Sequence, residues 1–308
     1  MNRHRYLIQC AAFLAVMGIV FSATSPYFFA LNNFANILTA STVIGLMALG
    51  ATFVIASGGI DLSTASVMAL AGVVAAIAAQ HTALPPAAII GLCLGIGAIC
   101  GFVNGLLINI TGAPSFIITL GMMSVARALA YIASHGMPVY GLPDTITVFG
   151  QGSFVGVAAP IWFLVAGTLI SIYLLGFTAF GQRVLILGDN PIAARAMGLP
   201  INRLRLKIYA LAGALSGLAG FIFMARTNSG DPTAGTSYEL IAITAVILGG
   251  ANLFGGRATI VGTVLGVLCL GVLQNGLNLL AISTFYQILF VGIVLLLAAS
   301  LRRQEASR

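Results

Sequence analysis

Charged side chains inside apolar stretches are the residues of this sequence best placed to do chemistry. A charge at the centre of a membrane helix costs roughly 2.5–3.5 kcal/mol, so each one requires a partner or a task. Arg127 stands in the apolar stretch GMMSVARALAYI. It would either line a path for a solute or form an ion pair or a contact with a backbone carbonyl, and we expect the second role.

Two carboxylates stand beside helix breaks, where a structural role is the first expectation. Asp61 lies in SGGIDLSTAS, in which two glycines end one helix and Asp61 or Ser63 is predicted to cap the next. Glu239 in TSYEL is predicted to form a capping box with Thr236. We expect both carboxylates to cap helices rather than to contact a substrate.

Three amide side chains stand near the ends of apolar runs, at Asn104, Asn275 and Asn278. An amide both donates and accepts hydrogen bonds, which suits the hydroxyl groups of a sugar. The same property suits contacts between helices in a membrane. The sequence leaves both roles open, and the three residues are candidates either for a translocation path or for helix packing.

Motifs for catalysis and cofactor binding are missing from the sequence. It contains neither the G-x-x-x-x-G-K-[ST] phosphate loop nor the H-E-x-x-H pattern of metalloproteases. The three histidines, His4, His81 and His135, fall in predicted tails or loops, and the four cysteines form no C-x-x-C pair. We therefore expect no enzymatic activity, no metal site and no cofactor held by this chain.

Composition indicates the elements that must position these side chains. Of the 308 residues, 60% are hydrophobic and 6% are charged, whereas a soluble domain carries roughly a quarter charged residues. A membrane-spanning helix needs about 20 apolar residues. The sequence offers ten such runs, at 7–24, 37–57, 62–80, 86–110, 115–133, 160–180, 208–228, 239–252, 259–280 and 284–301. We predict an all-α, polytopic membrane helix bundle that forms a single domain over residues 1–308.

The first and the eighth of these runs differ from the others. The first, 7–24, follows a basic start, but it is long and no A-x-A cleavage site follows it, so a retained helix is expected rather than a secretory signal. The eighth, 239–252, is short and ends in GGANLFGG. A broken or partly re-entrant helix is expected there.

The distribution of basic residues predicts the orientation of the bundle, since arginine and lysine gather on the cytoplasmic side. With the N-terminus inside, eleven of the thirteen basic residues lie in inner segments, the exceptions being Arg127 and Arg226. Both termini are therefore predicted to be cytoplasmic. The net charge of +7 follows from this topology, and without interleaved aromatic residues it does not indicate a nucleic-acid surface.

Small residues let membrane helices approach closely, and the sequence has 37 glycines. Close crossings are predicted at four G-x-x-x-G pairs: Gly91–Gly95, Gly97–Gly101, Gly213–Gly217 and Gly262–Gly266. A weak echo joins GAICGFVNGLL (97–107) to GVLCLGVLQNGLN (266–278), in two predicted helices of opposite direction. This pattern is the one expected of an inverted repeat.

A basic segment interrupts the apolar runs at residues 181–207 and contains a short predicted helix. Asn190 suits its N-cap, Pro191 its first helical position and Gly198 its end. The helix would have about seven residues, or ~10 Å at 1.5 Å per residue. Because it is too short to be stable alone, we expect its anchors or a partner to hold it.

The predicted short helix carries a small apolar strip of Ala193, Ala194 and Met197, while Arg195 projects elsewhere. An ordinary inner loop would also be basic. The paired caps nevertheless favour a docking element over a loop. If the strip docks on a partner, the Ala194→Arg substitution is expected to break the docking without unfolding the bundle.

Several stretches together resemble the ribose-type sugar permeases of ATP-binding-cassette (ABC) importers. They cover nearly the whole chain: GGIDLSTASVMAL, FVNGLLI, PSFIITLG, LGDNPIAARAMGLPINRLRLKIYALAGALSGLAG, YELIAITAVILGGANLFGGRATIVGT and LQNGLNLL. Two places depart mildly from the family pattern, where GDN (188–190) stands for G-G-N and TAS (64–66) for V-G-S. These departures leave the identity of the sugar open, but not the family.

The resemblance implies a multi-pass subunit of the bacterial inner membrane that pairs with a second permease, either an identical copy or a sister chain. A cytoplasmic ATPase, which holds ATP and Mg²⁺, would supply the energy, and a periplasmic binding protein would deliver the sugar. The resemblance also places the ATPase-coupling helix at residues 190–198, within the cytoplasmic segment 181–207.

A second class of function is an ATP-independent secondary transporter or channel for a small polar solute. A carrier coupled to protons or sodium would show ionisable residues paired deep in the bundle. Only Arg127 is clearly placed there by the sequence. We therefore expect the ABC permease.

Overall fold

The computed structural model describes residues 5–283, 285–287, 289–290 and 292–293, and this part of the chain is mainly helical. Seven of its helices are long and apolar enough to cross a membrane. They are α2 (Leu31–Ala56), α3 (Thr64–His81), α4 (Pro86–Thr111), α5 (Ser115–Ala133), α7 (Ala159–Phe177), α10 (Ile201–Thr227) and α12 (Ile260–Leu279). Each coincides with a predicted run, which confirms a polytopic, all-α membrane protein.

The three other predicted runs differ from these seven. α1 (Arg5–Thr24) covers the run 7–24 with 20 residues. α11 (Tyr238–Leu248) has 11 residues, or about 16 Å of helix against a hydrocarbon core of about 30 Å. The run 284–301 lies largely outside the described residues. The total of ten spans and the location of the termini therefore stay predictions.

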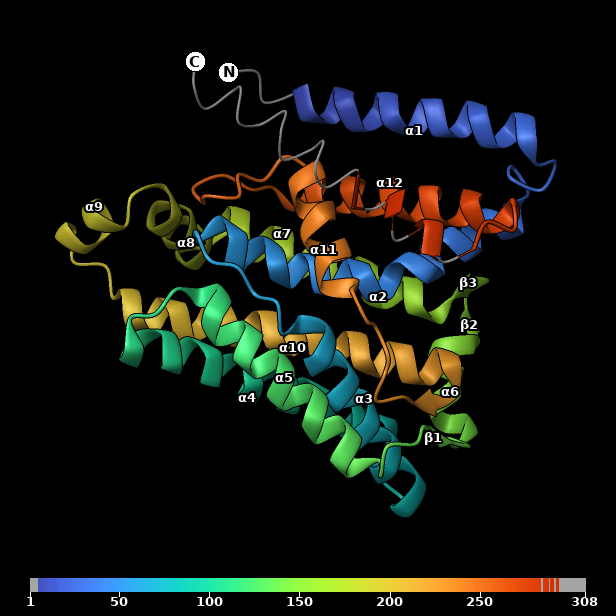
Figure 1. Ribbon diagram of the computed structural model, residues 1–308, viewed down its shortest axis with the longest axis horizontal. Coiled ribbons are helices and arrows are strands. Elements are labelled where there is room, and N and C mark those ends of the chain that lie inside the picture. Colours follow the sequence, from blue (N-terminus) through green and yellow to red (C-terminus); the bar gives the residue numbers. More distant parts are fainter. Residues whose placement is uncertain (1–4, 284, 288, 291, 294–308) are drawn as a thin grey trace.

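The connections between helices gather at two ends of the bundle (Figure 1). One end carries α8 (Ala179–Asp189) and α9 (Pro191–Ala196). The opposite end carries α6 (Asp144–Gln151) and two short antiparallel strand pairs, β1 (Val139–Tyr140) with β4 (Ser229–Gly230) and β2 (Ser153–Phe154) with β3 (Val157–Ala158). In the predicted orientation the α9 end is cytoplasmic and the α6 end faces the outside.

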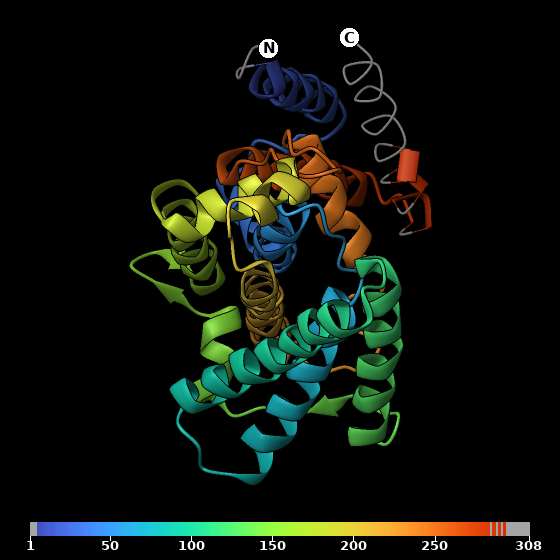
Figure 2. The same cartoon turned by 90° about the vertical axis from the view of Figure 1, so that its left-hand side faces the viewer.

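α10 runs through the middle of the bundle, with α2 on one side and α3 and α4 on the other (Figure 2). It begins at Ile201, well before the predicted span 208–228. Arg203, Arg205 and Lys207 therefore belong to its first two turns rather than to a loop. A hydropathy count misses such turns because it stops at charged residues, whose long side chains can still reach water from a helix end.

Glycine faces bring α4 against α10 and α11 against α12. An added Cβ would overlap a partner's backbone at Gly97, Gly101, Gly213, Gly217, Gly262 and Gly266, which confirms three of the four predicted crossings. The prediction at Gly91–Gly95 is wrong, since a Cβ there would meet no atom within 4 Å. At 3.6 residues per turn, Gly95 lies on the face of α4 opposite to Gly97.

The two segments of the internal echo lie in α4 and α12, which run in opposite directions along the bundle (Figure 1). Each uses its glycines to approach a neighbouring helix closely, α10 for the first and α11 for the second. This arrangement is compatible with an inverted repeat, which stays a prediction.

Candidate functional site

α9 begins with the cap that its sequence predicts. The Asn190 side-chain oxygen accepts hydrogen bonds from the backbone N–H groups of Ile192 at 3.1 Å and Ala193 at 2.9 Å. Pro191 occupies the first helical position, where its missing N–H leaves no donor unpaired. The start of α9 is therefore fixed by local sequence.

The end of α9 is a Schellman motif. The N–H of Gly198 donates to the carbonyl of Arg195 at 3.0 Å, and the N–H of Leu199 donates to the carbonyl of Ala194 at 3.1 Å. Gly198 adopts φ +73°, a left-handed conformation that favours glycine. Both ends of this six-residue helix are thus capped by residues next to it in the chain.

The apolar surface of α9 differs from the predicted strip of Ala193, Ala194 and Met197. Ala194 is 0% exposed and belongs to the same core as Leu187 and Ile201, so it faces the bundle and not a partner. The outward apolar side chains are Ile192, 84% exposed, and Met197, 62% exposed. The expectation for Ala194→Arg is therefore wrong, because the guanidinium would enter this core and disturb the bundle itself.

α9 is held in place by α8, which the sequence analysis did not predict. Gly188 of α8 packs directly on the carbonyl of Ala56, the last residue of α2, and on the backbone of Gly256. The N–H of Gly256 also donates to the Ala56 carbonyl at 3.0 Å. Through α8, α9 is thus connected to the end of α2 and to the connection between α11 and α12.

The connection between α2 and α3 contains Asp61, whose side chain is 4% exposed. One carboxylate oxygen accepts hydrogen bonds from the backbone N–H of Ser63 at 2.8 Å and from its hydroxyl at 2.6 Å. Ser63 occupies the N-cap position of α3, but its side chain caps no helical N–H. The predicted cap is therefore absent, because Ser63 directs its hydroxyl to Asp61 and Asp61 bonds to the N-cap residue itself.

Side chains of neighbouring helices complete the surroundings of Asp61. Asn104 of α4 is fully buried and donates to the Ser63 hydroxyl at 3.0 Å, while its own side-chain oxygen has no partner among the described residues. Ser115 and Thr119 of α5 accept hydrogen bonds from backbone N–H groups of the Asp61 connection at 3.0 and 3.2 Å. Neither hydroxyl was predicted to face Asp61, although both belong to the stretch PSFIITLG of the family pattern.

Arg127 of α5 reaches the connection between α10 and α11. Its guanidinium donates to the backbone carbonyls of Pro232 at 2.5 Å and Ala234 at 3.0 Å. Asp231 and Glu239 lie near enough to interact with its positive charge. Arg127 therefore ties α5 to the connection that leads into α11 through carbonyl contacts.

The capping box predicted for Thr236 and Glu239 does not form. α11 begins at Tyr238, and Ser237 takes the N-cap position with φ +70° and no side-chain cap hydrogen bond. The Thr236 hydroxyl instead donates to the carbonyl of Thr233 at 2.9 Å. The helix starts one residue later than the capping box requires, which leaves Glu239 in the first turn beside Arg127.

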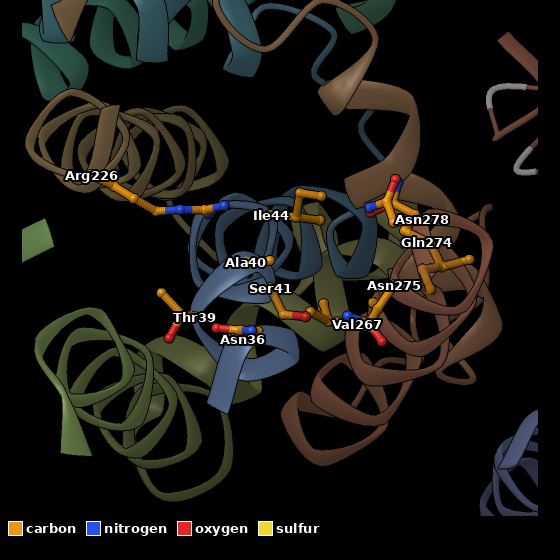
Figure 3. Close-up of a pocket in the computed structure, with 12 residues that line it drawn as sticks. Asn36, Thr39, Ala40, Ser41, Ile44, Arg226, Val267, Gln274, Asn275 and Asn278 are labelled. Atoms are coloured by element: carbon orange, nitrogen blue, oxygen red, sulfur yellow. The ribbon is translucent and has the colours of Figure 1, made fainter. Parts of the chain in front are cut away.

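Asn275 and Asn278 of α12 line a cavity of about 290 Å³ between α2 and α12 (Figure 3). Asn275 exchanges two amide hydrogen bonds with Asn33 of α2, at 2.9 and 3.0 Å. The Asn278 oxygen accepts from Gln287 at 2.7 Å. Asn104 lies elsewhere, beside Asp61, so the three predicted amides belong to two different sites.

Further polar residues of this cavity escaped the sequence analysis. They are Asn36, Thr39 and Ser41 on α2, Gln274 on α12 and Arg226 at the end of α10. Asn36 was missed because the predicted span began at 37, whereas α2 begins at Leu31. The usable signal was the amide-rich stretch LNNFAN before the apolar run, together with LQNGLN in α12.

The long apolar helices, packed around buried amides and hydroxyls, are those of a polytopic membrane protein. The family described as "Branched-chain amino acid transport system / permease component" matches residues 33–299. The chain belongs to this family and is a multi-pass inner-membrane protein.

Curated relatives agree with this assignment over most of their length. The chain is 42% identical to the ribose import permease protein RbsC of Escherichia coli K12, over 93% of this chain and 90% of that protein. It is 44% identical to RbsC of Bacillus subtilis, covering 96% and 92%, and 40% identical to the L-arabinose ABC transporter permease protein AraH of Azospirillum brasilense, covering 95% and 87%. No solved structure matches the chain.

Proposed function

We propose that this chain is the permease subunit of an ABC importer for a monosaccharide, a ribose-like pentose or a hexose. Relatives named as ribose, arabinose and allose permeases support the sugar class. A separate cytoplasmic ATPase holds ATP and Mg²⁺ and drives transport, and a periplasmic binding protein delivers the sugar. A second permease, identical or a sister chain, completes the path, and this chain itself catalyses no reaction.

The observation that carries the proposal is α9. A helix of six residues is too short to be stable by itself, yet both of its ends are capped and it is fixed to the bundle through Ala194. It presents Ile192 and Met197 outward, away from the apolar helices. Two large apolar side chains on a rigid projection suit insertion into a groove of a partner protein.

Met197→Glu tests this docking role directly. The substitution removes apolar contact of about 1.5–3 kcal/mol and places a charge in the interface, so the affinity for the ATPase is expected to fall at least ~10-fold. The measurement is the amount of ATPase subunit that copurifies with a tagged permease from gently solubilised membranes. Val155→Glu is the matched control, because Val155 is 92% exposed at the opposite end of the bundle.

The control variant is expected to retain the ATPase at the wild-type level. Equal ATPase recovery with Met197→Glu and with wild type, in a folded permease, would contradict the docking role of α9.

The second candidate function is an ATP-independent carrier, and Asp61 is the observation that favours it. Among the described residues, the buried carboxylate of Asp61 accepts hydrogen bonds from Ser63 alone, and it resembles the ionisable groups of proton- or sodium-coupled carriers. Uptake by vesicles that contain no ATP, driven by an ion gradient alone, would select this candidate over the importer.

A further inference from the structure

The cavity between α2 and α12 contains a buried hydroxyl without a partner. Ser41 is 3% exposed and its oxygen makes no hydrogen bond to any described residue. Opposite it stands Gly271 of α12, where an added Cβ would overlap the Ser41 oxygen. Leaving a polar group buried and unpaired is unfavourable, but the Ser41 oxygen is packed against Gly271 and is too enclosed for a ligand to contact it. It belongs to the closed inner wall of the cavity.

The walls of the cavity carry further free donors and acceptors. Asn36 and Thr39 of α2 and Gln274 of α12 line it, and their side chains make no hydrogen bond within the described part of the chain. Figure 3 shows the Arg226 side chain extending from α10 toward α2 at one edge. The reciprocal bonds between Asn33 and Asn275 join the two helices and hold the walls at a fixed separation.

The size and chemistry of the cavity define a class of ligand. A volume of about 290 Å³ lies at the lower end of the ~300–1,000 Å³ typical of sites for drug-sized molecules. Amides and hydroxyls offer both donors and acceptors, as a ligand with many hydroxyl groups requires. Facing lipid with this many free polar groups would be costly, which favours a surface that contacts water and solute.

We propose that this cavity binds the transported monosaccharide near the outer end of the permease, with Thr39, Asn36 and Gln274 contacting its hydroxyl groups. The inference rests on the proposed function. Arg226 belongs to the end of α10 opposite α9, so the cavity receives the sugar on the side where a binding protein would release it.

The test is the protection of an engineered thiol in the complete importer. Gln274→Cys is labelled with a charged, membrane-impermeant methanethiosulfonate reagent, with D-ribose, L-arabinose or D-allose present in turn as the probe. A sugar at ten times its half-saturating concentration is expected to slow labelling about tenfold. Thr145→Cys on α6 is the matched control, because it is exposed at the same end outside the cavity and its labelling is expected to stay constant.

Thr39→Val provides an independent readout, because it removes a hydroxyl that lines the cavity and keeps the shape of the side chain. Loss of one hydrogen bond to the sugar is expected to reduce uptake about threefold to tenfold, while ATP hydrolysis stimulated by the binding protein stays at the wild-type rate. If no sugar slows the labelling of the Gln274→Cys variant and Thr39→Val imports sugar at the wild-type rate, the proposed sugar site is overturned, provided that the wild-type complex imports a probe sugar. A wild-type complex that imports none of the three sugars overturns the proposed function as well.

Discussion

At the scale of single residues, the role of Asp61 distinguishes an importer driven by ATP from a carrier driven by an ion gradient. Its carboxylate is nearly fully buried and accepts both of its hydrogen bonds from Ser63, which itself accepts from Asn104. In an importer driven by ATP, these bonds hold the connection between α2 and α3 in shape. In a carrier driven by an ion gradient, the same carboxylate would bind the coupling ion.

Asp61→Asn is expected to retain most of the uptake. The asparagine oxygen can still accept from Ser63, although without the added strength of a charged acceptor. Asp61→Leu is the contrasting variant, because it leaves the Ser63 N–H and hydroxyl unpaired at a cost of about 1–3 kcal/mol and should lower the yield of folded protein. Uptake rates and the thermal unfolding midpoint measure both effects. Loss of all uptake in a stable Asp61→Asn protein would contradict a purely structural role.

Ala194 shows which features of a short helix can be predicted from the sequence and which cannot. The caps of α9 follow from Asn190, Pro191 and Gly198, because capping depends on local chemistry. Which face of the helix turns inward depends on α8, whose position the sequence does not reveal. The small side chain of Ala194 fits the buried face, and the larger Met197 is left outside.

At the scale of elements, the contact of α8 with the end of α2 joins the candidate docking helix to the rest of the bundle. Gly188 lies against the Ala56 carbonyl and Gly256, and Gly58, the second residue after α2, has φ +81°. A displacement of α9 is therefore expected to reach the Asp61 connection through backbone contacts, without flexible side chains in between.

Gly188→Ala is expected to disturb the contact between α8 and the end of α2. The new methyl group would overlap the Ala56 carbonyl and the Gly256 nitrogen, and overpacking of this kind costs about 1–3 kcal/mol. We expect a lower thermal unfolding midpoint and fewer sugar molecules imported per ATP hydrolysed. The matched control is Gly91→Ala, whose methyl group meets no atom within 4 Å and should change neither quantity. If the two variants have equal unfolding midpoints and import equal numbers of sugar molecules per ATP, the proposed role of this contact is refuted.

The long apolar helices could be predicted from the sequence, whereas the short or charged helical segments could not. The seven long spans follow from apolar runs, because burial in lipid requires them. α8 escaped prediction because its sequence, AFGQRVLILGD, mixes charged and apolar residues without a strong pattern. The first turns of α10 were not predicted, because the apolar run is interrupted there by Arg203, Arg205 and Lys207. The helix itself continues through these residues.

At the scale of the whole molecule, the polar sites are made of residues that are far apart in the sequence. Asn33 and Asn275 are separated by 242 positions and still share two hydrogen bonds. Asn275 and Asn278 could be picked out as unusual amides, but their partners on α2 depend on how the bundle folds. The fold class and the family were therefore accessible from the sequence, whereas the cavity was not.

The measurement that tests the central claim most directly is sugar uptake by reconstituted vesicles. The tagged permease is purified with its copurifying subunits, reconstituted with or without ATP on the ATPase side, and supplied with labelled D-ribose, L-arabinose or D-allose and the binding protein. We predict uptake that requires ATP and that the Met197→Glu variant strongly reduces, because its affinity for the ATPase is lower. Uptake of equal rate in vesicles without ATP, unaffected by Met197→Glu, would contradict an ABC importer.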